Sequence, residues 1–441
     1  MADEYDYFSS EETETRPARR EGGRHATNNT RERSVPRQRE SSRVRTGSRR
    51  NGFSEQEDDY EWEEAPRRRR TSSLHRTMGD SRNATIDLWK FIYSWFVVLY
   101  HYLQHSKPFT SGKYAVEFFL IVAGVFFFMG FEKKDREGTA AVGPYVGKRF
   151  ARLFPWALTG FIFAFVVKRM VIGSIGSMGE LADYLSKDIW EILLVKMNGF
   201  NQGNPLLNDP AWTLSAMFLV EIVMIGFLCS NKKNFVNVVL PITLIIGYGF
   251  WRNTEMGNVA DWIGFTTLGV LRAWLAYGCA YYCFRLSEYM KKISYSGFGR
   301  LCLTVIEALL HLFAIYTMMY KATRYWQWCA TLAFVGAVAI SISGQSLWNA
   351  ILGKLSGLTS FLSGLSLSIY LIHYPIYEYF KQIYTKKAAL FSHVWSFIIV
   401  TLVFSLLHYF VTKGIISLWR ILCPRVRSLL IEEGPEEVHG I

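Results

Sequence analysis

Residues 115–130 have the sequence AVEFFLIVAGVFFFMG, in which Glu117 is the one charged side chain. A helix of about 20 residues crosses the hydrocarbon core of a bilayer, so this stretch predicts a span at 113–131. Similar apolar blocks recur along the chain, and such a series makes the bilayer the solvent of the whole domain. The sequence therefore predicts an all-α polytopic membrane helix bundle of about ten transmembrane helices, at 88–104, 113–131, 150–171, 212–229, 235–251, 266–284, 300–320, 325–343, 361–380 and 393–412.

The composition argues against a soluble multidomain protein. Of the 441 residues, 50% are hydrophobic and 16% are aromatic. The formal net charge of +12 does not require a nucleic-acid partner, because cytoplasmic loops of membrane proteins collect Lys and Arg. The 6 cysteines form no CxxC pair, so we expect neither a metal site nor a disulfide framework.

Three regions differ in character. Residues 1–83 are rich in Arg, Glu and Ser and nearly lack aliphatic side chains, which predicts a disordered cytoplasmic tail. Acidic residues nearly balance its arginines, so we expect no nucleic acid to bind it. Residues 84–420 hold the predicted transmembrane domain, and residues 421–441 are expected to form a short cytoplasmic tail.

The predicted topology follows from the first span and from the loop charges. The first apolar block comes only after Thr85, so we expect this block, rather than a cleavable signal peptide, to insert the chain. A cytoplasmic N-terminus places most Lys and Arg clusters of the loops inside, which predicts a multi-pass protein of the plasma membrane.

The longest predicted outer loop, 173–211, contains an amphipathic run over 181–197. Its apolar residues recur at helical spacing, which predicts a helix. That helix lies on the outer surface of the membrane or caps a cavity in one interpretation. In the other it is a packed connector.

Titratable side chains inside spans are costly and are therefore functional candidates. The first span carries Asp87 near its inner end and His101 near its outer end, and the second span carries Glu117. A short link joins the two spans, so we expect His101 and Glu117 at similar depth, where a carboxylate orients an imidazole and raises its basicity. An interfacial histidine is the alternative for His101, and the pair suits a proton-coupled transporter equally well.

Two further groups of residues are functional candidates. Arg149 and Arg152 are three residues apart at the cytoplasmic start of the third span, so they share a helix face and can grip phosphates. Anchoring to lipid headgroups is the alternative. His373 lies in the ninth predicted span, and Pro375 frees backbone carbonyls beside it, although a packing role would also explain this histidine.

Taken in order, these segments resemble the acyltransferase 3 family of membrane O-acyltransferases, over about 86–412. The resemblance rests on Ile86-Asp87-Leu88 with His101, on AVEFFLIVAG (115–124), on RFARLFP (149–155), on Trp212-Thr213-Leu214-Ser215 and on SIYLIHYP (368–375). One departure occurs at Met217, where the family often has glutamate. Glu221, one turn later, is a possible substitute.

The resemblance implies transfer of an acyl group, expected to be acetyl, from acyl-CoA to a hydroxyl of a cell-envelope carbohydrate or a lipid-linked acceptor. Arg149 and Arg152 would hold the phosphates of the donor. His101 would act as general base or accept the acyl group, and Glu117 would orient it. Supporting roles fall to the remaining candidates, Asp87, Trp212 and His373.

Two other functions compete with this one. A proton-coupled transporter or exporter would use Glu117 and His101 as a proton relay and would tolerate lysine at Arg149 and Arg152. A non-catalytic scaffold would depend on residues 1–83 to recruit cytoplasmic partners. The sequence does not indicate an oligomeric state.

Overall fold

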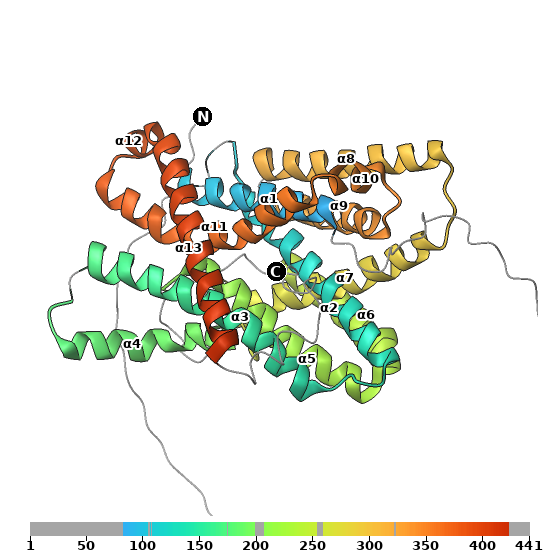
Figure 1. The fold of residues 1–441 in the computed structure, drawn as a ribbon, viewed down its shortest axis with the longest axis horizontal. Helices are drawn as coiled ribbons and strands as arrows, with labels where there is room; N and C mark the ends of the chain where they lie inside the picture. The colour runs from blue at the N-terminus through green and yellow to red at the C-terminus, as the bar shows by residue number, and fades with distance from the viewer. Residues whose placement is uncertain are drawn as a thin grey trace, which may run out of the picture. The chain divides into compact units, whose positions relative to one another are not determined.

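The computed structural model describes residues 83–422, except 105, 107, 174, 199–206, 254–258 and 322 and the side chain of Arg324. Within the described part, the regular secondary structure is helical, and loops and one isolated bridge between Trp262 and Thr267 connect the helices (Figure 1). The predicted all-α bundle is thereby confirmed. The α-helices are α1 (Ala84–Tyr102), α2 (Ala115–Arg136), α3 (Val142–Phe165), α4 (Met178–Ile192), α5 (Trp212–Asn234), α6 (Leu240–Asn253), α7 (Leu268–Lys291), α8 (Gly297–Tyr320), α9 (Arg324–Ser343), α10 (Leu347–Gly353), α11 (Ser356–Ile383), α12 (Lys387–Ser392) and α13 (Val394–Leu422).

Each predicted span falls on a helix, but the count of ten is not confirmed. Within the described residues, 6 helices are long and apolar enough to cross a membrane, or 7 if α10 and α11, bent by 95°, form one span. The predicted spans 212–229 and 235–251 belong to one 45-residue stretch, Asp209–Asn253. This stretch is broken where Asn231 leaves helical geometry (φ −156°, ψ 82°) and a π-helical segment, Phe235–Val239, follows.

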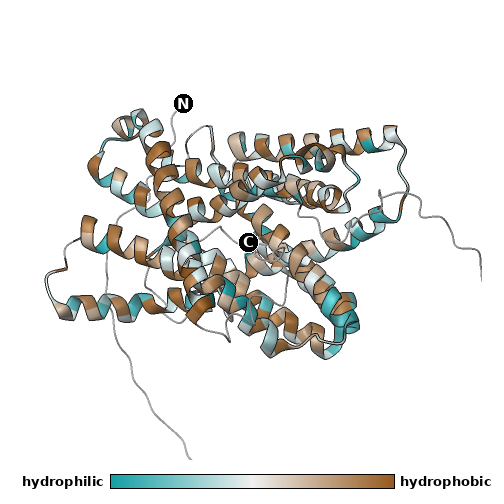
Figure 2. Cartoon of the chain, viewed as in Figure 1, coloured by the Kyte–Doolittle hydropathy of each residue, from teal (hydrophilic) through white to brown (hydrophobic). Residues whose placement is uncertain are grey.

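Helices from the two ends of the described chain pack together at α1. This helix packs most extensively against α11, while α2 packs against α7, and α8 against α9. Apolar side chains dominate the helices, as the brown ribbon of Figure 2 shows. Tyr93, Val98 and Tyr102 of α1 are fully buried. In this way the fold brings the first and ninth predicted spans side by side.

The link between α1 and α2 contains a close approach that requires glycine. A Cβ at Gly112 would lie 2.3 Å from the carbonyl oxygen of Phe96 and 2.6 Å from the Cβ of Tyr100. The chain therefore returns tightly against the last turns of α1, within a few residues of His101, before α2 begins.

The predicted amphipathic run of the outer loop forms α4. Its apolar Leu185 and Ile189 are exposed by 42% and 45%, whereas its acidic Asp188 and Glu191 are buried. Lys196 lies 3.5 Å from Asp188 and 3.6 Å from Glu191, which compensates the buried charge. An apolar face directed outward is the arrangement expected of a helix that lies in a membrane interface.

The predicted tails lie outside the described residues, except Asn83 at one end and Ile421 and Leu422 at the other. The Asn83 side chain accepts a hydrogen bond from the backbone N–H of Ile86 at 3.0 Å and so caps α1. Disorder and cytoplasmic location of the tails stay predictions.

Candidate active site

The two predicted histidines meet between α1 and α11, with 5.4 Å between the ring centroids of His101 and His373. The ring of Tyr374 lies 5.2 Å from that of His101. His101 is half-buried, whereas His373 is fully buried. We call His101 and His373 the histidine pair.

The hydrogen bonding of His373 determines its tautomer. Its Nδ1 lies 3.1 Å from the backbone carbonyl oxygen of Ile369, and a carbonyl can only accept. Nδ1 therefore carries the proton in the neutral ring, and Nε2 carries the lone pair. Among the described residues, Nε2 of His373 has no hydrogen-bond partner although it is buried. A buried nitrogen in this state is an available base.

Pro375 shapes the backbone next to His373. Because proline lacks an N–H, the carbonyl of Leu371 loses its partner one turn on, as the sequence predicts. Asn208 supplies the missing donor, with its Nδ2 at 2.7 Å from the Leu371 oxygen. Glu191 holds Asn208 in turn by accepting its backbone N–H at 3.0 Å. The loop that contains Asn208 is thus fixed to α11 two residues before His373.

Glu117 has a different partner from the predicted one. Arg272 of α7 donates from Nε and Nη2 to its two carboxylate oxygens, each at 2.6 Å, and Gln327 of α9 donates at 2.8 Å. These bonds reach both carboxylate oxygens of Glu117, and the predicted role of Glu117 in orienting His101 stays a prediction. Trp212 supports the same group, since the guanidinium of Arg272 lies 5.4 Å from its ring. Glu117, Arg272 and Gln327 form what we call the Glu117 cluster.

Arg149 is also committed to a carboxylate. Its Nε lies 2.5 Å from Oε2 of Glu221, and its Nη2 donates to Oε1 at 2.7 Å. The hydroxyls of Tyr145 and Tyr277 donate to the same carboxylate at 2.8 Å and 2.5 Å. We call these four residues the Glu221 cluster. Since Glu221 neutralises Arg149, the two arginines of α3 differ: Arg149 is buried in an ion pair, and Arg152 is half-buried.

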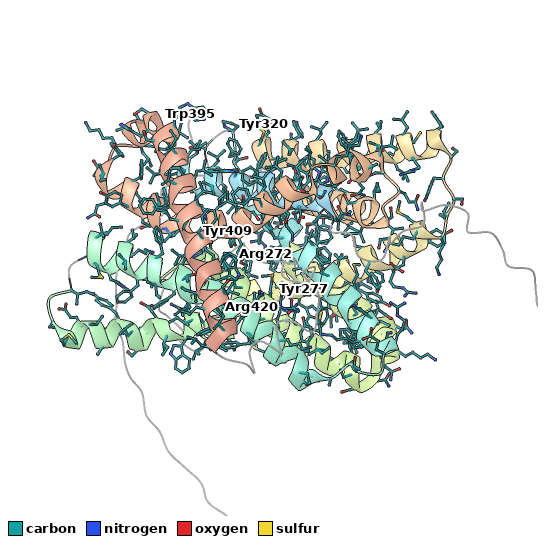
Figure 3. All side chains as sticks on the ribbon, viewed as in Figure 1. Arg272, Tyr277, Tyr320, Trp395, Tyr409 and Arg420 are labelled. Carbon is teal, nitrogen blue, oxygen red and sulfur yellow. The ribbon has the colours of Figure 1, made fainter. Side chains whose placement is uncertain are left out.

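One helix serves both clusters. Figure 3 labels Arg272 and Tyr277, through which α7 takes part in the Glu117 cluster and the Glu221 cluster respectively. Because Arg272 and Tyr277 lie on the same helix, a shift of α7 would move a member of each cluster.

Asp87 does not join the histidine pair. It is buried on the first turn of α1, beside the buried Lys90. Fourteen residues separate it from His101, which corresponds to about 21 Å along a helix. A direct role for Asp87 at the histidines is excluded by this length.

An apolar pocket lies between α2, α5 and α11. Phe119, Met217 and Tyr370 are among its lining residues. The ring of Tyr370 lies 6.1 Å from that of His373, so one end of the pocket adjoins the histidine pair. Met217, where the sequence departs from the family pattern, belongs to this pocket, and Glu221 instead binds Arg149.

Arg272, Gln327 and Asn208 are among the contributors to these contacts that were not predicted from sequence. Arg272 lies within the predicted span 266–284, where a charge is as costly as Glu117, so the rule applied to Glu117 would have found it. Gln327 and Asn208 are uncharged, and only their contacts distinguish them. In the described part of the chain, no group of three or more His, Cys, Asp or Glu side chains could hold a metal ion.

Comparison with known proteins gives one match. A sequence model described as an acyltransferase domain matches residues 83–410, most of the chain. No curated protein sequence and no solved structure matches. The matched range begins at the cap of α1 and includes the histidine pair, both clusters and the apolar pocket. The chain therefore belongs to the acyltransferase 3 family of membrane acyltransferases.

Proposed function

We propose that the protein is an O-acyltransferase that moves an acyl group from acyl-CoA to the hydroxyl of a cell-envelope carbohydrate or lipid-linked acceptor. The observation that carries this proposal is the histidine pair, because it offers a half-buried imidazole beside a buried one with an available Nε2. The family supports acyl transfer in general.

In the proposed reaction, the histidine pair accepts one proton and then releases it. His101, the more accessible ring, removes the proton from the acceptor hydroxyl as its oxygen attacks the thioester carbonyl. A C–O bond forms and the C–S bond breaks, and the same proton passes to the departing thiolate to give free CoA. His373, with its fixed tautomer, stabilises the protonated state of His101. A general base of this kind contributes about 10²–10⁴-fold to the rate.

The donor reaches the site from the cytoplasm in this proposal. Arg152, which is half-buried near the start of α3, provides the charge for a phosphate of CoA. Arg149 then acts by holding α3 against α5. The cytoplasmic N-terminus and the plasma membrane complete the proposed topology, with the histidine pair towards the outer side.

Glu117, Trp212 and Asp87 have structural roles in the proposal. The Glu117 cluster joins α2, α7 and α9 through buried bonds, and Trp212 packs on its guanidinium. Loss of Glu117 or Arg272 leaves an unpaired buried charge, which destabilises the bundle.

The experiment uses the purified full chain in lipid nanodiscs with radiolabelled acyl-CoA and an envelope extract. Wild type is expected to label a carbohydrate or lipid-linked acceptor, and His101→Ala is expected to lose at least about 100-fold of that rate. His393→Ala, which changes a histidine at the end of α12, is the matched control and should transfer normally. Equal rates for His101→Ala and wild type would contradict the proposed role of the pair.

A further inference from the structure

The apolar pocket extends from the histidine pair towards the Glu221 cluster. Tyr370 lines its end near His373, and Ser366 lines it one turn earlier on α11. On the facing helix α5, Thr213 and Met217 line it over one turn, and Glu221 follows one turn beyond. The pocket therefore begins beside the histidine pair and extends along α5 in the direction of Glu221.

Its lining has little capacity to bind polar groups. Seven of the ten lining residues are aliphatic, Met or Phe, and the remaining three are Thr213, Ser366 and Tyr370. The Ser366 hydroxyl already donates to the carbonyl of Ser363 at 2.6 Å, and the Thr213 hydroxyl to that of Pro210 at 3.2 Å. An occupant with amide groups would lose hydrogen bonds to water without replacement. A hydrocarbon chain needs none.

We propose that this pocket holds the acyl chain of the donor, and that the protein prefers a medium-length fatty acyl group to acetyl. This inference rests on the proposed transfer at the histidine pair, which places the thioester carbonyl near Tyr370. The lining on α2 runs from Val116 to Ala123, about 10 Å along the helix axis, so an acetyl group would contact one end of it only, whereas each added methylene gains apolar contact.

Met217 sets the length in this arrangement. It lies at the distal end of the pocket, and its unbranched side chain adapts to the occupant. Tryptophan at this position would fill the pocket without adding a charge, whereas leucine would keep its volume and polarity. Ala123, on the opposite wall, offers an independent position for the same test.

The test compares acetyl-, butanoyl-, hexanoyl-, octanoyl- and dodecanoyl-CoA with the full chain in nanodiscs. We expect kcat/KM to rise about four-fold per methylene until the pocket is filled and then to fall. Met217→Trp should lower kcat/KM for octanoyl-CoA about ten-fold or more and leave acetyl-CoA nearly unchanged. Met224→Leu, at a buried methionine of the same helix outside the pocket lining, is the matched control and should keep the wild-type profile.

If Met217→Trp does not fold, Ala123→Leu replaces it with the same expectation. A wild type whose kcat/KM is highest for acetyl-CoA would overturn the inference. A pocket-filling variant whose kcat/KM falls equally for all donors would also overturn it.

A second measurement does not depend on turnover. A photoreactive octanoyl-CoA thioether is cross-linked to the protein, with and without excess octanoyl-CoA, and the labelled peptides are identified by mass spectrometry. Competable labels within 213–217 or 366–370 support the pocket, even if no acceptor is acylated. In that case the proposed function fails while the acyl site stands. Competable labels only at other segments would overturn the acyl site whatever the activity.

Discussion

Replacing Arg149 by methionine separates two roles for this residue, the donor binding predicted from sequence and the ion pair observed in the structure. Glu221 is 1% exposed and receives two contacts from the guanidinium and two from tyrosine hydroxyls. Arg149→Met would remove the cation and leave the carboxylate in a buried site. The loss of one partner of a buried pair costs about 3–5 kcal/mol.

The double variant provides the magnitude of the interaction. Glu221→Met alone leaves the buried guanidinium unpaired and should cost a similar amount. With both residues changed to methionine, neither charge remains, and replacement of a buried pair by apolar side chains is often neutral. The two single losses sum to about 6–10 kcal/mol. We therefore expect the double variant to be more stable than this sum predicts, by at least about 3 kcal/mol.

The assay is equilibrium unfolding in mixed micelles as the fraction of denaturing detergent rises, followed by tryptophan fluorescence. The KM for acyl-CoA is measured on the same four proteins. Losses that add within about 0.5 kcal/mol would refute a coupled pair. A large rise in KM for Arg149→Met with unchanged stability would instead indicate that Arg149 binds the donor.

Three further predictions concern other parts of the chain. Asn208→Ala leaves the carbonyl of Leu371 without a donor and should cost about 1–3 kcal/mol in the same unfolding assay, and Pro375→Ala, which restores a backbone N–H, should recover most of that loss. Burial raises the pKa of Glu191 from 4.5 to about 7, although some of its neighbours oppose this shift, so between these pH values the folded chain holds a proton that the unfolded chain releases. The free energy of unfolding should therefore fall by about 3 kcal/mol between pH 4.5 and pH 7. Glu191→Gln should remove this pH dependence. Deletion of residues 1–82 should leave the acyl-transfer rate of the purified protein within about two-fold, whereas loss of activity would favour the scaffold function.

Local properties of the chain allowed the helices to be predicted. The length and composition of an apolar block determine whether it can cross a bilayer, and both are visible in a stretch such as 115–130. The break after α5 was also visible, because Lys232 and Lys233 lie between two apolar runs. Pro375 indicated a freed carbonyl for the same reason, since its effect reaches only one turn back.

Pairing between distant helices could not be predicted in the same way. Glu117 and Arg272 are 155 residues apart, and Arg149 and Glu221 are 72 apart. The charge of Glu117 required a partner, but sequence proximity favoured His101, which lies on the adjacent helix. Burial between α2, α7 and α9 determined the actual partner. The motif resemblance included both His101 and His373, which local patterns do not connect, and the structure places their ring centroids 5.4 Å apart.

Acyl transfer by the purified full chain, measured for wild type, His101→Ala and His373→Ala, tests the central claim most directly. Radiolabelled octanoyl-CoA and acetyl-CoA serve as donors, and His393→Ala is the control. We predict acceptor labelling by wild type and the control, with losses of at least about 100-fold for His101→Ala. The transfer rate of His373→Ala should fall substantially and its pH profile should shift, because the partner of His101 is lost. Undiminished transfer by both histidine variants, or transfer by none of the folded proteins, would contradict the account.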